Sequence, residues 1–352
     1  MKNNMRKIFR FITLCLPAAA LLACSGNIDP DGETVKLTLS ADKTEIVADG
    51  NDKVQFTIMN GSQDVTAMAK ISCSPASGIV KDNTFTTAAE GTYVFTASYE
   101  GKNSDPVSIT ATAPEASRFA RRVCLMEFTG TWCSQCPSGA VTVTYLVDVA
   151  YKGKAFAMAF HNEDIYQIPQ EQELYKKFRF GGYPGFVTDM RDTGSILDGG
   201  CSTSIEKSLY ETIIHSGAAI ECQATANEDG TVTGTATGKA FSEMTMNYRM
   251  AAYVIEDKVK GEQKLATNEI DKDYVHRHIV RKMLSASIAG DDLGTVAAES
   301  EVSKKYEFTT DKEWNAENVS VAVLVLDDKG HVNNMAICSC MNGKMDYKYS
   351  EQ

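Results

Sequence analysis

The feature that most constrains this 352-residue chain is a pair of cysteines, Cys133 and Cys136, within the sequence Thr-Trp-Cys-Ser-Gln-Cys-Pro. Thiols at this spacing can close a disulfide across the first turn of a helix, whose N-terminus favours the thiolate of the leading cysteine and lowers its pKa. Residues 123–128 form a short apolar run that predicts a buried strand, followed by a Thr-Gly-Thr turn. A strand that delivers this pair to a helix start predicts a site for thiol–disulfide exchange.

The N-terminus predicts a secretory signal peptide over residues 1–23. An apolar stretch over residues 11–23, too short to span a bilayer as a helix, follows four basic residues: Lys2, Arg6, Lys7 and Arg10. The stretch ends Leu-Leu-Ala-Cys at Cys24, which resembles the bacterial lipobox, in which the cysteine is acylated and becomes the first mature residue. We therefore expect a lipid on Cys24 that anchors the protein to a membrane. The alternative is an ordinary cleavage site beside a chance cysteine.

Charge and cysteine content exclude several classes of protein. Removal of residues 1–23 leaves 31 basic and 46 acidic residues, a net charge of −15, which argues against nucleic acid as a partner and against adhesion to anionic lipid through basic patches. The mature length favours two or three domains. The cysteines are too sparse for a disulfide scaffold. The sequence leaves open whether four of them are buried thiols or include one disulfide: Cys201, Cys222, Cys338 and Cys340.

Two segments precede the cysteine motif in the mature chain. Residues 24–34 are polar, with no apolar period, and predict a lipidated tether. Residues 35–113 contain short runs of alternating apolar residues between turn clusters, which predict a small antiparallel β-sandwich. The sequence over residues 39–49 resembles bacterial Ig-like domains of cell-surface proteins. That resemblance implies a spacer, and a ligand-binding role is the alternative.

Residues 119–217 alternate between strand and helix signals. We expect a helix over residues 138–153, although Val-Thr-Val-Thr-Tyr at 141–145 has the β-branched alternation of a strand, because Pro137 suits a first helical turn and tertiary context often overrides propensity. A buried strand over residues 155–160 ends in His161. A helix from Pro169 to Phe178 and a strand near residues 181–188 follow. Thr203 and Glu206 form a capping box for a last helix that ends near Gly217.

The order of these elements resembles the thioredoxin superfamily. Glu127 stands six residues before Cys133, where thioredoxins carry the buried acid that accepts a proton from the second cysteine. Tyr183 and Pro184 stand where the family has its cis-proline beside the disulfide, and an X-Pro bond can adopt the cis form at modest cost. The resemblance implies that Trp132 packs beside the thiols and that Tyr183 and Pro184 bind the backbone of a partner. A plain strand-end carboxylate and a trans turn are the alternatives for Glu127 and Pro184.

Residues 218–345 are strand-like and predict a C-terminal β domain, a β-sandwich. The layout, with Tyr-Val-His-Arg-His-Ile-Val-Arg at 274–281 and Trp-Asn-Ala-Glu-Asn at 314–318, resembles the twenty-eight-kilodalton outer membrane protein family over about residues 122–341. The resemblance implies an envelope lipoprotein of Gram-negative bacteria, with a thioredoxin-like domain followed by a β domain. The expected fold is thus multidomain, with α/β and all-β parts.

Other groups of residues indicate a function less strongly, and we expect no metal and no cofactor. His276 and His278 would share one face of a strand, but no nearby ligand completes a metal site by spacing. Cys338 and Cys340 could join the cysteine motif in a zinc site only across a long stretch of chain. His161 could line the redox cleft, and a partly exposed loop histidine is the favoured interpretation.

Two functions remain open. The first is an envelope-tethered thiol–disulfide oxidoreductase that exchanges with thiols or disulfides of exported proteins: Cys133 attacks, Cys136 resolves the mixed disulfide, and Glu127 moves the proton. The second is a surface binding or assembly lipoprotein in which the cysteine pair is only structural. Both place the chain in the cell envelope, lipid-anchored at the outer membrane on either face. The Ser-Gln dipeptide between the cysteines does not distinguish reductase, oxidase and isomerase, and the sequence indicates no oligomeric state.

Overall fold

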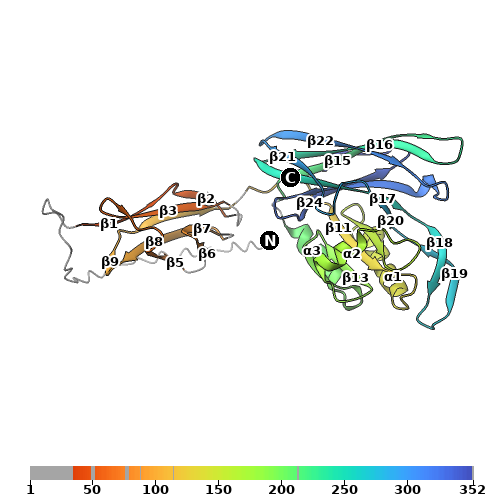
Figure 1. The fold of residues 1–352 in the computed structure, drawn as a ribbon, viewed down its shortest axis with the longest axis horizontal. Helices are drawn as coiled ribbons and strands as arrows, with labels where there is room; N and C mark the ends of the chain where they lie inside the picture. The colour runs from red at the N-terminus through yellow and green to blue at the C-terminus, as the bar shows by residue number, and fades with distance from the viewer. Residues whose placement is uncertain are drawn as a thin grey trace, which may run out of the picture. The chain divides into compact units, whose positions relative to one another are not determined.

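The computed structural model describes residues 35–48, 52–75, 79–87, 89–113, 115–211 and 214–350. The chain divides into two compact units, residues 1–114 and residues 115–352 (Figure 1). The expected signal peptide, the lipid on Cys24 and the tether over residues 24–34 lie outside the described residues. No helix within the described ranges is long and apolar enough to cross a membrane.

The first unit is a sandwich of two sheets. One sheet has the order β1-β3-β7-β6 with β4 on β3, and the other has the order β2-β10-β8-β5 with β9 on β8. The strands are β1 Leu37–Ala41, β2 Glu45–Val47, β3 Val54–Asn60, β4 Gln63–Asp64, β5 Lys70–Ser74, β6 Ile79–Lys81, β7 Thr84–Thr86, β8 Gly91–Tyr99, β9 Lys102–Asn103 and β10 Val107–Thr112.

Alternating burial along these strands explains the sandwich. In β3, Val54, Phe56 and Ile58 are buried while the residues between them are exposed, and β8 buries Tyr93 and Phe95 in the same way. These side chains share one core, and apolar surface removed from water stabilises the pairing of the two sheets. The expectation of purely antiparallel pairing is wrong at one place, because β2 and β10 are parallel.

The second unit contains a nine-stranded sheet that runs through most of its length. Its order is β14-β13-β11-β12-β20-β17-β23-β24, with β21 paired to β17. The strands are β11 Val123–Thr129, β12 Ala155–His161, β13 Gly185–Thr188, β14 Asp192–Ser195, β17 Met246–Glu256, β20 Ile279–Met283, β21 Asp291–Val296, β23 Val319–Leu326 and β24 Val332–Ser339. Strand β11 is parallel to β12, to which it is connected through a helical crossover, and antiparallel to β13.

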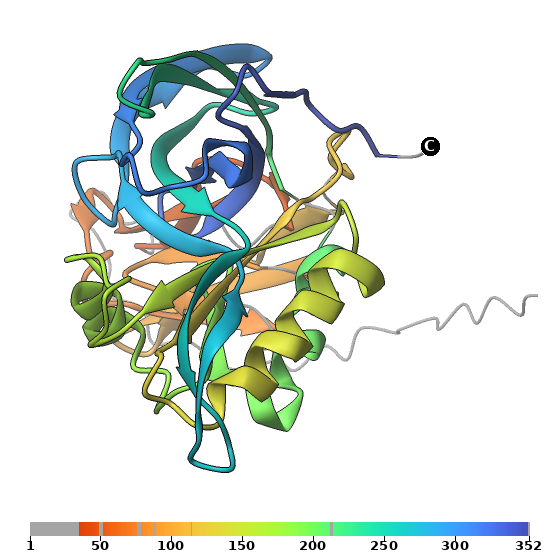
Figure 2. The same cartoon turned by 90° about the vertical axis from the view of Figure 1, so that its right-hand side faces the viewer.

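A second sheet and a hairpin complete the β structure of this unit. The sheet has the order β22-β16-β15-β25, from β15 Ser216–Ala226, β16 Val232–Ser242, β22 Ser300–Thr309 and β25 Lys344–Met345. The hairpin consists of β18 Val259–Lys264 and β19 Ile270–His276. It extends from the large sheet alongside helix α1, Cys136–Tyr145, in both views (Figures 1 and 2).

The helices gather at the end of the unit opposite the four-stranded sheet (Figure 1). Helix α1 continues as one π-helical turn at Leu146–Ala150. The β-branched residues at 141–145 therefore lie in a helix, as expected. Helix α2 covers Glu171–Phe178. The expected bounds of the last helix are wrong, since α3 covers Gly200–Tyr210 with Gly199 as its N-cap, and Gly217 already lies in β15. Short 3₁₀ turns occupy Ile196–Asp198 and Ala316–Asn318.

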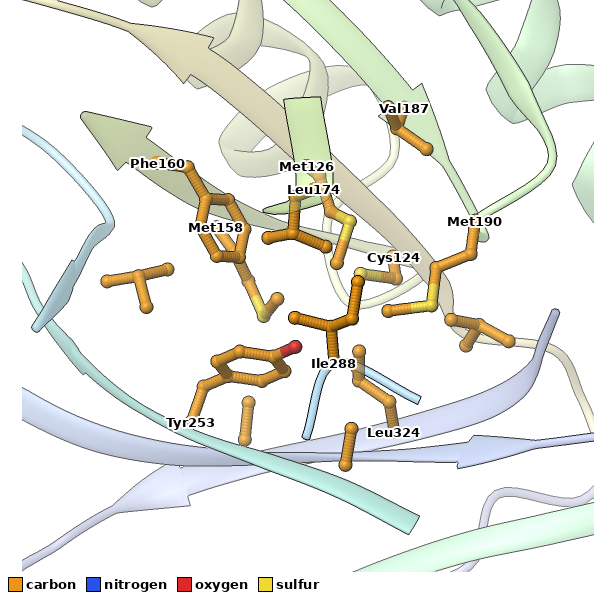
Figure 3. Packing of buried hydrophobic residues seen from close by; sticks show 14 of the residues in the cluster. Cys124, Met126, Met158, Phe160, Leu174, Val187, Met190, Tyr253, Ile288 and Leu324 are labelled. Atoms are coloured by element: carbon orange, nitrogen blue, oxygen red, sulfur yellow. The ribbon is translucent and has the colours of Figure 1, made fainter. Parts of the chain in front are cut away.

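One hydrophobic cluster joins the helical end of the large sheet to its all-β end. Phe160 of β12 lies edge-to-face on Tyr253 of β17, with ring centroids 5.8 Å apart. Figure 3 shows Met158 and Phe160 close to Tyr253, and Leu174 of α2 belongs to the same buried cluster. Strand β12 also pairs with β20 in parallel, at Ala159 and Ile279. The sheet therefore runs across the expected boundary between residues 217 and 218.

Candidate functional site

The cysteine motif lies where a fully buried strand meets a helix. All seven residues of β11 are buried, so the strand holds the following turn in a fixed position. Cys133 and Cys136 form a disulfide with a Cα–Cα distance of 5.4 Å, and Cys136 is the first residue of α1. The side chains of the pair are enclosed, Cys133 with 5% and Cys136 with 1% of its surface exposed. Trp132 beside them is 45% exposed.

Glu127 lies in β11, the strand that precedes the cysteine motif, and is 3% exposed. Its Oε1 atom is buried and has no hydrogen-bond partner among the described residues. Burial raises the pKa of this carboxyl from 4.5 to about 8, because the low-dielectric interior disfavours its charged form. Glu127 is therefore mostly protonated at neutral pH while the disulfide is closed.

A small cavity of about 10 Å³ connects Glu127 with the second cysteine. Cys136, His161 and Tyr274 line it together with Glu127. This volume is at the lower limit for a single water molecule, and the polar lining gives such a molecule hydrogen-bond partners. The arrangement can hold a proton within reach of the sulfur of Cys136, which is the sulfur that leaves when Cys133 is attacked.

Pro184 packs against the first turns of the motif helix. The Tyr183–Pro184 peptide bond is cis, which confirms the sequence-based prediction of that bond. A Cβ atom built on Gly139 would lie 2.8 Å from Cβ of Pro184, so the helix approaches the proline closely and only glycine fits there. The Tyr183 ring contacts Trp132 edge-to-face, with centroids 5.6 Å apart. The structure thus brings Trp132, Tyr183 and Pro184 to the same side of the motif.

A residue far along the chain also contacts the motif. Gln263 of β18 is 2% exposed, and its Nε2 atom donates to the carbonyl oxygen of Cys133 at 3.0 Å. The backbone N–H of Lys264 donates to the carbonyl oxygen of Thr131 at 2.8 Å. The hairpin therefore holds the loop that carries Cys133. Nothing in the local sequence around Gln263 indicates this contact, because it depends on how β18 is placed by the large sheet.

His161 is part of the site and is 2% exposed, so the interpretation as a partly exposed loop residue is wrong. Its Nδ1 atom lies 2.7 Å from Oδ2 of Asp164, which also accepts a hydrogen bond from the backbone N–H of Thr131 at 2.8 Å. Its ring lies edge-to-face on His276, with centroids 5.3 Å apart. Burial and the neighbouring His161 lower the pKa of His276 to about 4. These contacts link the end of β12 and the hairpin to the motif loop.

The remaining candidate ligands do not form a metal centre. Among the described residues, no group of three or more His, Cys, Asp or Glu side chains could hold a metal ion. The six other described cysteines are free thiols, and Sγ of Cys338 lies 3.5 Å from Sγ of Cys222. Cys338 and Cys340 belong to a separate cluster around β15 and β24, which does not include the cysteine motif.

Comparisons with known proteins support part of the sequence-based resemblance. The family model described as outer membrane protein Omp28 matches residues 172–339, which include Tyr183, Pro184 and Gln263. The match confirms the resemblance to that family but begins after the cysteine motif, whereas the expected span was residues 122–341. The comparison with curated proteins found no match.

Two solved structures are similar to parts of the chain. HBP35 of Porphyromonas gingivalis aligns with a TM-score of 0.52 and 21% identity, over 64% of this chain and 76% of that chain. The likeness concerns the fold. The adhesin InvE of Yersinia pseudotuberculosis aligns with a TM-score of 0.18 and 10% identity, over 89% of this chain and 58% of that chain.

Proposed function

We propose that this protein is an envelope thiol–disulfide oxidoreductase with a thioredoxin-like domain over residues 119–217. The observation that carries the proposal is the grouping of three features around one disulfide: Cys136 at a helix start, the buried carboxyl of Glu127, whose Oε1 atom has no hydrogen-bond partner among the described residues, and the cis Tyr183–Pro184 bond. A structural disulfide requires none of these three, since its contribution comes from restricting the unfolded chain.

The geometry supports the following exchange. In the reduced protein, the Cys133 thiolate attacks a disulfide of an exported protein, so a bond forms between Cys133 and one client sulfur and the other client sulfur leaves with the electron pair. Cys136 then attacks Cys133 and releases the first client sulfur as a thiolate. The client is reduced by two electrons and the pair of thiols becomes the disulfide. The ionised form of Glu127 accepts the proton of Cys136 as the disulfide closes, which leaves Glu127 neutral, and in the reverse reaction neutral Glu127 returns the proton.

The test is to trap the mixed disulfide. Replacing Cys136 by Ser removes the resolving thiol and keeps the attacking one, so client proteins of the envelope should accumulate covalently on Cys133 and be released by dithiothreitol. Cys133→Ser is the matched control and should trap nothing. If Cys136→Ser traps no protein and the reduced, unaltered protein does not react with a model disulfide, the proposal is wrong.

The enclosure of the pair favours a second candidate, a binding or assembly lipoprotein with a structural disulfide. Cys133 is only 5% exposed, and the Gln263 contact holds its loop. A redox titration separates the two candidates. A structural disulfide resists the glutathione pool and has a potential below about −300 mV, whereas an exchange site has a potential between about −270 and −120 mV.

We further propose that the protein is lipid-anchored through Cys24 at the outer membrane and that residues 35–113 form an Ig-like spacer. The match to a family described by its outer membrane location supports the location, and the two sheets with one core support the spacer. Fractionation of Cys24→Ala tests the anchor. Soluble or unprocessed protein is the expected result, and membrane-bound, lipid-labelled protein would contradict it.

A further inference from the structure

A groove beside the disulfide has a composition that the exchange chemistry does not require. Its volume is about 410 Å³, and it lies between the motif loop, the segment after β12, and α2. Eight residues line it: Trp132, Asn162, Glu163, Glu171, Gln172, Tyr175, Lys176 and Tyr183. Trp132 directly precedes Cys133 and Tyr183 directly precedes the cis-proline. A polypeptide that reaches the disulfide therefore passes this groove.

Three aromatic rings form one continuous wall of the groove. The Tyr183 ring contacts Trp132 edge-to-face and stacks on Tyr175, with centroids 5.6 Å and 5.9 Å apart. Trp132 Nε1 donates to the carbonyl oxygen of Asn162 at 2.8 Å, and the Tyr183 hydroxyl donates to Oε1 of Glu171 at 2.5 Å. The polar atoms of these two rings are thus satisfied within the protein. Trp132 is 45% and Tyr175 37% exposed, so parts of these two rings are accessible to a ligand.

The groove also carries negative charge. Glu171 is fully buried, and its carboxylate accepts hydrogen bonds from three neutral donors: Tyr183, Asn162 at 3.0 Å and Gln167 at 3.2 Å. A cation in the groove would interact with this carboxylate more strongly than in bulk water, because the protein screens charge less than water does. Glu163 adds a second carboxylate to the lining, and Lys176 is its one basic residue.

We propose that this groove binds a cationic side chain, arginine or lysine, that neighbours the reactive cysteine of an exported client protein. The inference rests on the proposed exchange function and adds to it a preference for clients with a basic residue beside the reactive cysteine. A guanidinium or ammonium group over aromatic faces is attracted by the ring quadrupoles, and the carboxylates attract it further. The net charge of −15 in the mature chain favours the approach of such a client.

The test uses reduced protein and short peptides whose single cysteine carries 5-thio-2-nitrobenzoate in a mixed disulfide. The Cys133 thiolate attacks the peptide sulfur, and the coloured thiolate leaves with the electron pair, so its absorbance gives the rate. Peptides with arginine beside the cysteine should react about fivefold faster than those with glutamine, and those with glutamate more slowly still. Added salt should reduce the difference.

We predict that two variants change the ratio of the arginine-peptide rate to the glutamine-peptide rate in opposite directions. Glu171→Gln should lower the arginine-to-glutamine ratio of rates below that of the unaltered protein. Lys176→Gln removes an exposed competing cation and should raise the ratio above that of the unaltered protein. Because Lys176 is exposed, this second variant keeps the test valid even if Glu171→Gln does not fold.

A reagent without flanking residues, 5,5′-dithiobis(2-nitrobenzoate), separates failure of this inference from failure of the exchange function. If this reagent reacts with Cys133 but the unaltered protein shows a ratio of one, the cationic preference is wrong and the exchange function stands. If neither the reagent nor any peptide reacts, both proposals are wrong. Equal ratios in all three proteins would also overturn the inference.

Discussion

The second unit contains two close pairs of cysteines in contrasting surroundings. Cys133 and Cys136 are bonded at the start of α1, beside an exposed tryptophan and a buried acid. Cys222 of β15 and Cys338 of β24 come from two different sheets, with their sulfurs 3.5 Å apart inside the core between those sheets. The hydrogen bond with Cys338 and burial raise the pKa of the Cys222 thiol, which makes it a poor nucleophile.

This contrast indicates that sulfur proximity alone does not make an exchange site. The first pair has a helix N-terminus, a nearby buried carboxyl with a raised pKa at Glu127 and an adjoining groove. The second pair lies in a hydrophobic cluster between two sheets, where buried free cysteines commonly act as small apolar side chains. Four variants test how far the two pairs differ.

The largest expected effect is on exchange activity. Cys133→Ser should lower the rate of reduction of a model disulfide to that of the buffer, because a hydroxyl cannot replace the thiolate. Cys222→Ser is the matched control and should retain the rate of the unaltered protein. Residual exchange in Cys133→Ser that disappears when Cys338 is also replaced would show that the second pair is reactive and would contradict the contrast.

The next largest effect concerns the protonation of Glu127. In the folded protein the pKa of Glu127 is about 8, above the ordinary value of 4.5. The contribution of this group to the free energy of unfolding therefore falls as the pH rises from about 4.5 through 8. Glu127→Gln cannot ionise, and should be more stable than the unaltered oxidised protein by on the order of 4 kcal/mol at pH 8. Near pH 4.5 the two should be similar. Urea unfolding across this range measures the difference, and a constant difference would contradict the assignment.

A smaller effect is expected at the second pair. Cys222→Ser places a hydroxyl in an apolar core and should lower the free energy of unfolding by about 1–3 kcal/mol. The redox potential of Cys133 and Cys136 should not change, because the hydrophobic cluster that contains Cys222 and Cys338 does not include them. Urea unfolding of the oxidised protein and a glutathione titration measure the two quantities. A shifted potential would mean that the pairs are coupled.

The smallest expected effect is at the hairpin. Gln263→Ala removes the hydrogen bond to Cys133 and should lower the free energy of unfolding by about 1 kcal/mol. Alkylation of reduced Cys133 by iodoacetamide should become severalfold faster as the loop loosens. Gln223→Ala, at an exposed position of β15, is the control and should change neither quantity. An unchanged alkylation rate in Gln263→Ala would show that the hairpin does not limit access.

The sequence predicts the centre of the site well because its signals are local. Cys133, Cys136 and Glu127 lie within ten consecutive residues, and the strand, turn and helix that position them follow directly from that segment. The cis bond at Pro184 could be expected from its place in the resemblance. Local signals also identify residues 218–345 as rich in strands, which the structure confirms.

The remaining parts of the site depend on pairing between distant segments. Gln263 lies 130 residues from Cys133, and its approach follows from the placement of β18 beside the large sheet. The alternation of apolar residues indicates that a strand has a buried face but not which strand it joins. For the same reason the sequence divides the chain at residue 217, where the structure has one sheet. The burial of His161 could not be predicted for the same reason, because His276, which packs against its ring, comes from a distant strand.

The continuity of the large sheet affects how the second unit can fold. A gene ending after residue 217 would encode β12 without β20, and would expose Met158 and Phe160, which Tyr253 and Leu324 cover in the whole unit. An open strand edge beside exposed apolar side chains promotes aggregation. We therefore expect the helical and all-β parts to need one another to fold, whereas the first unit has a core of its own.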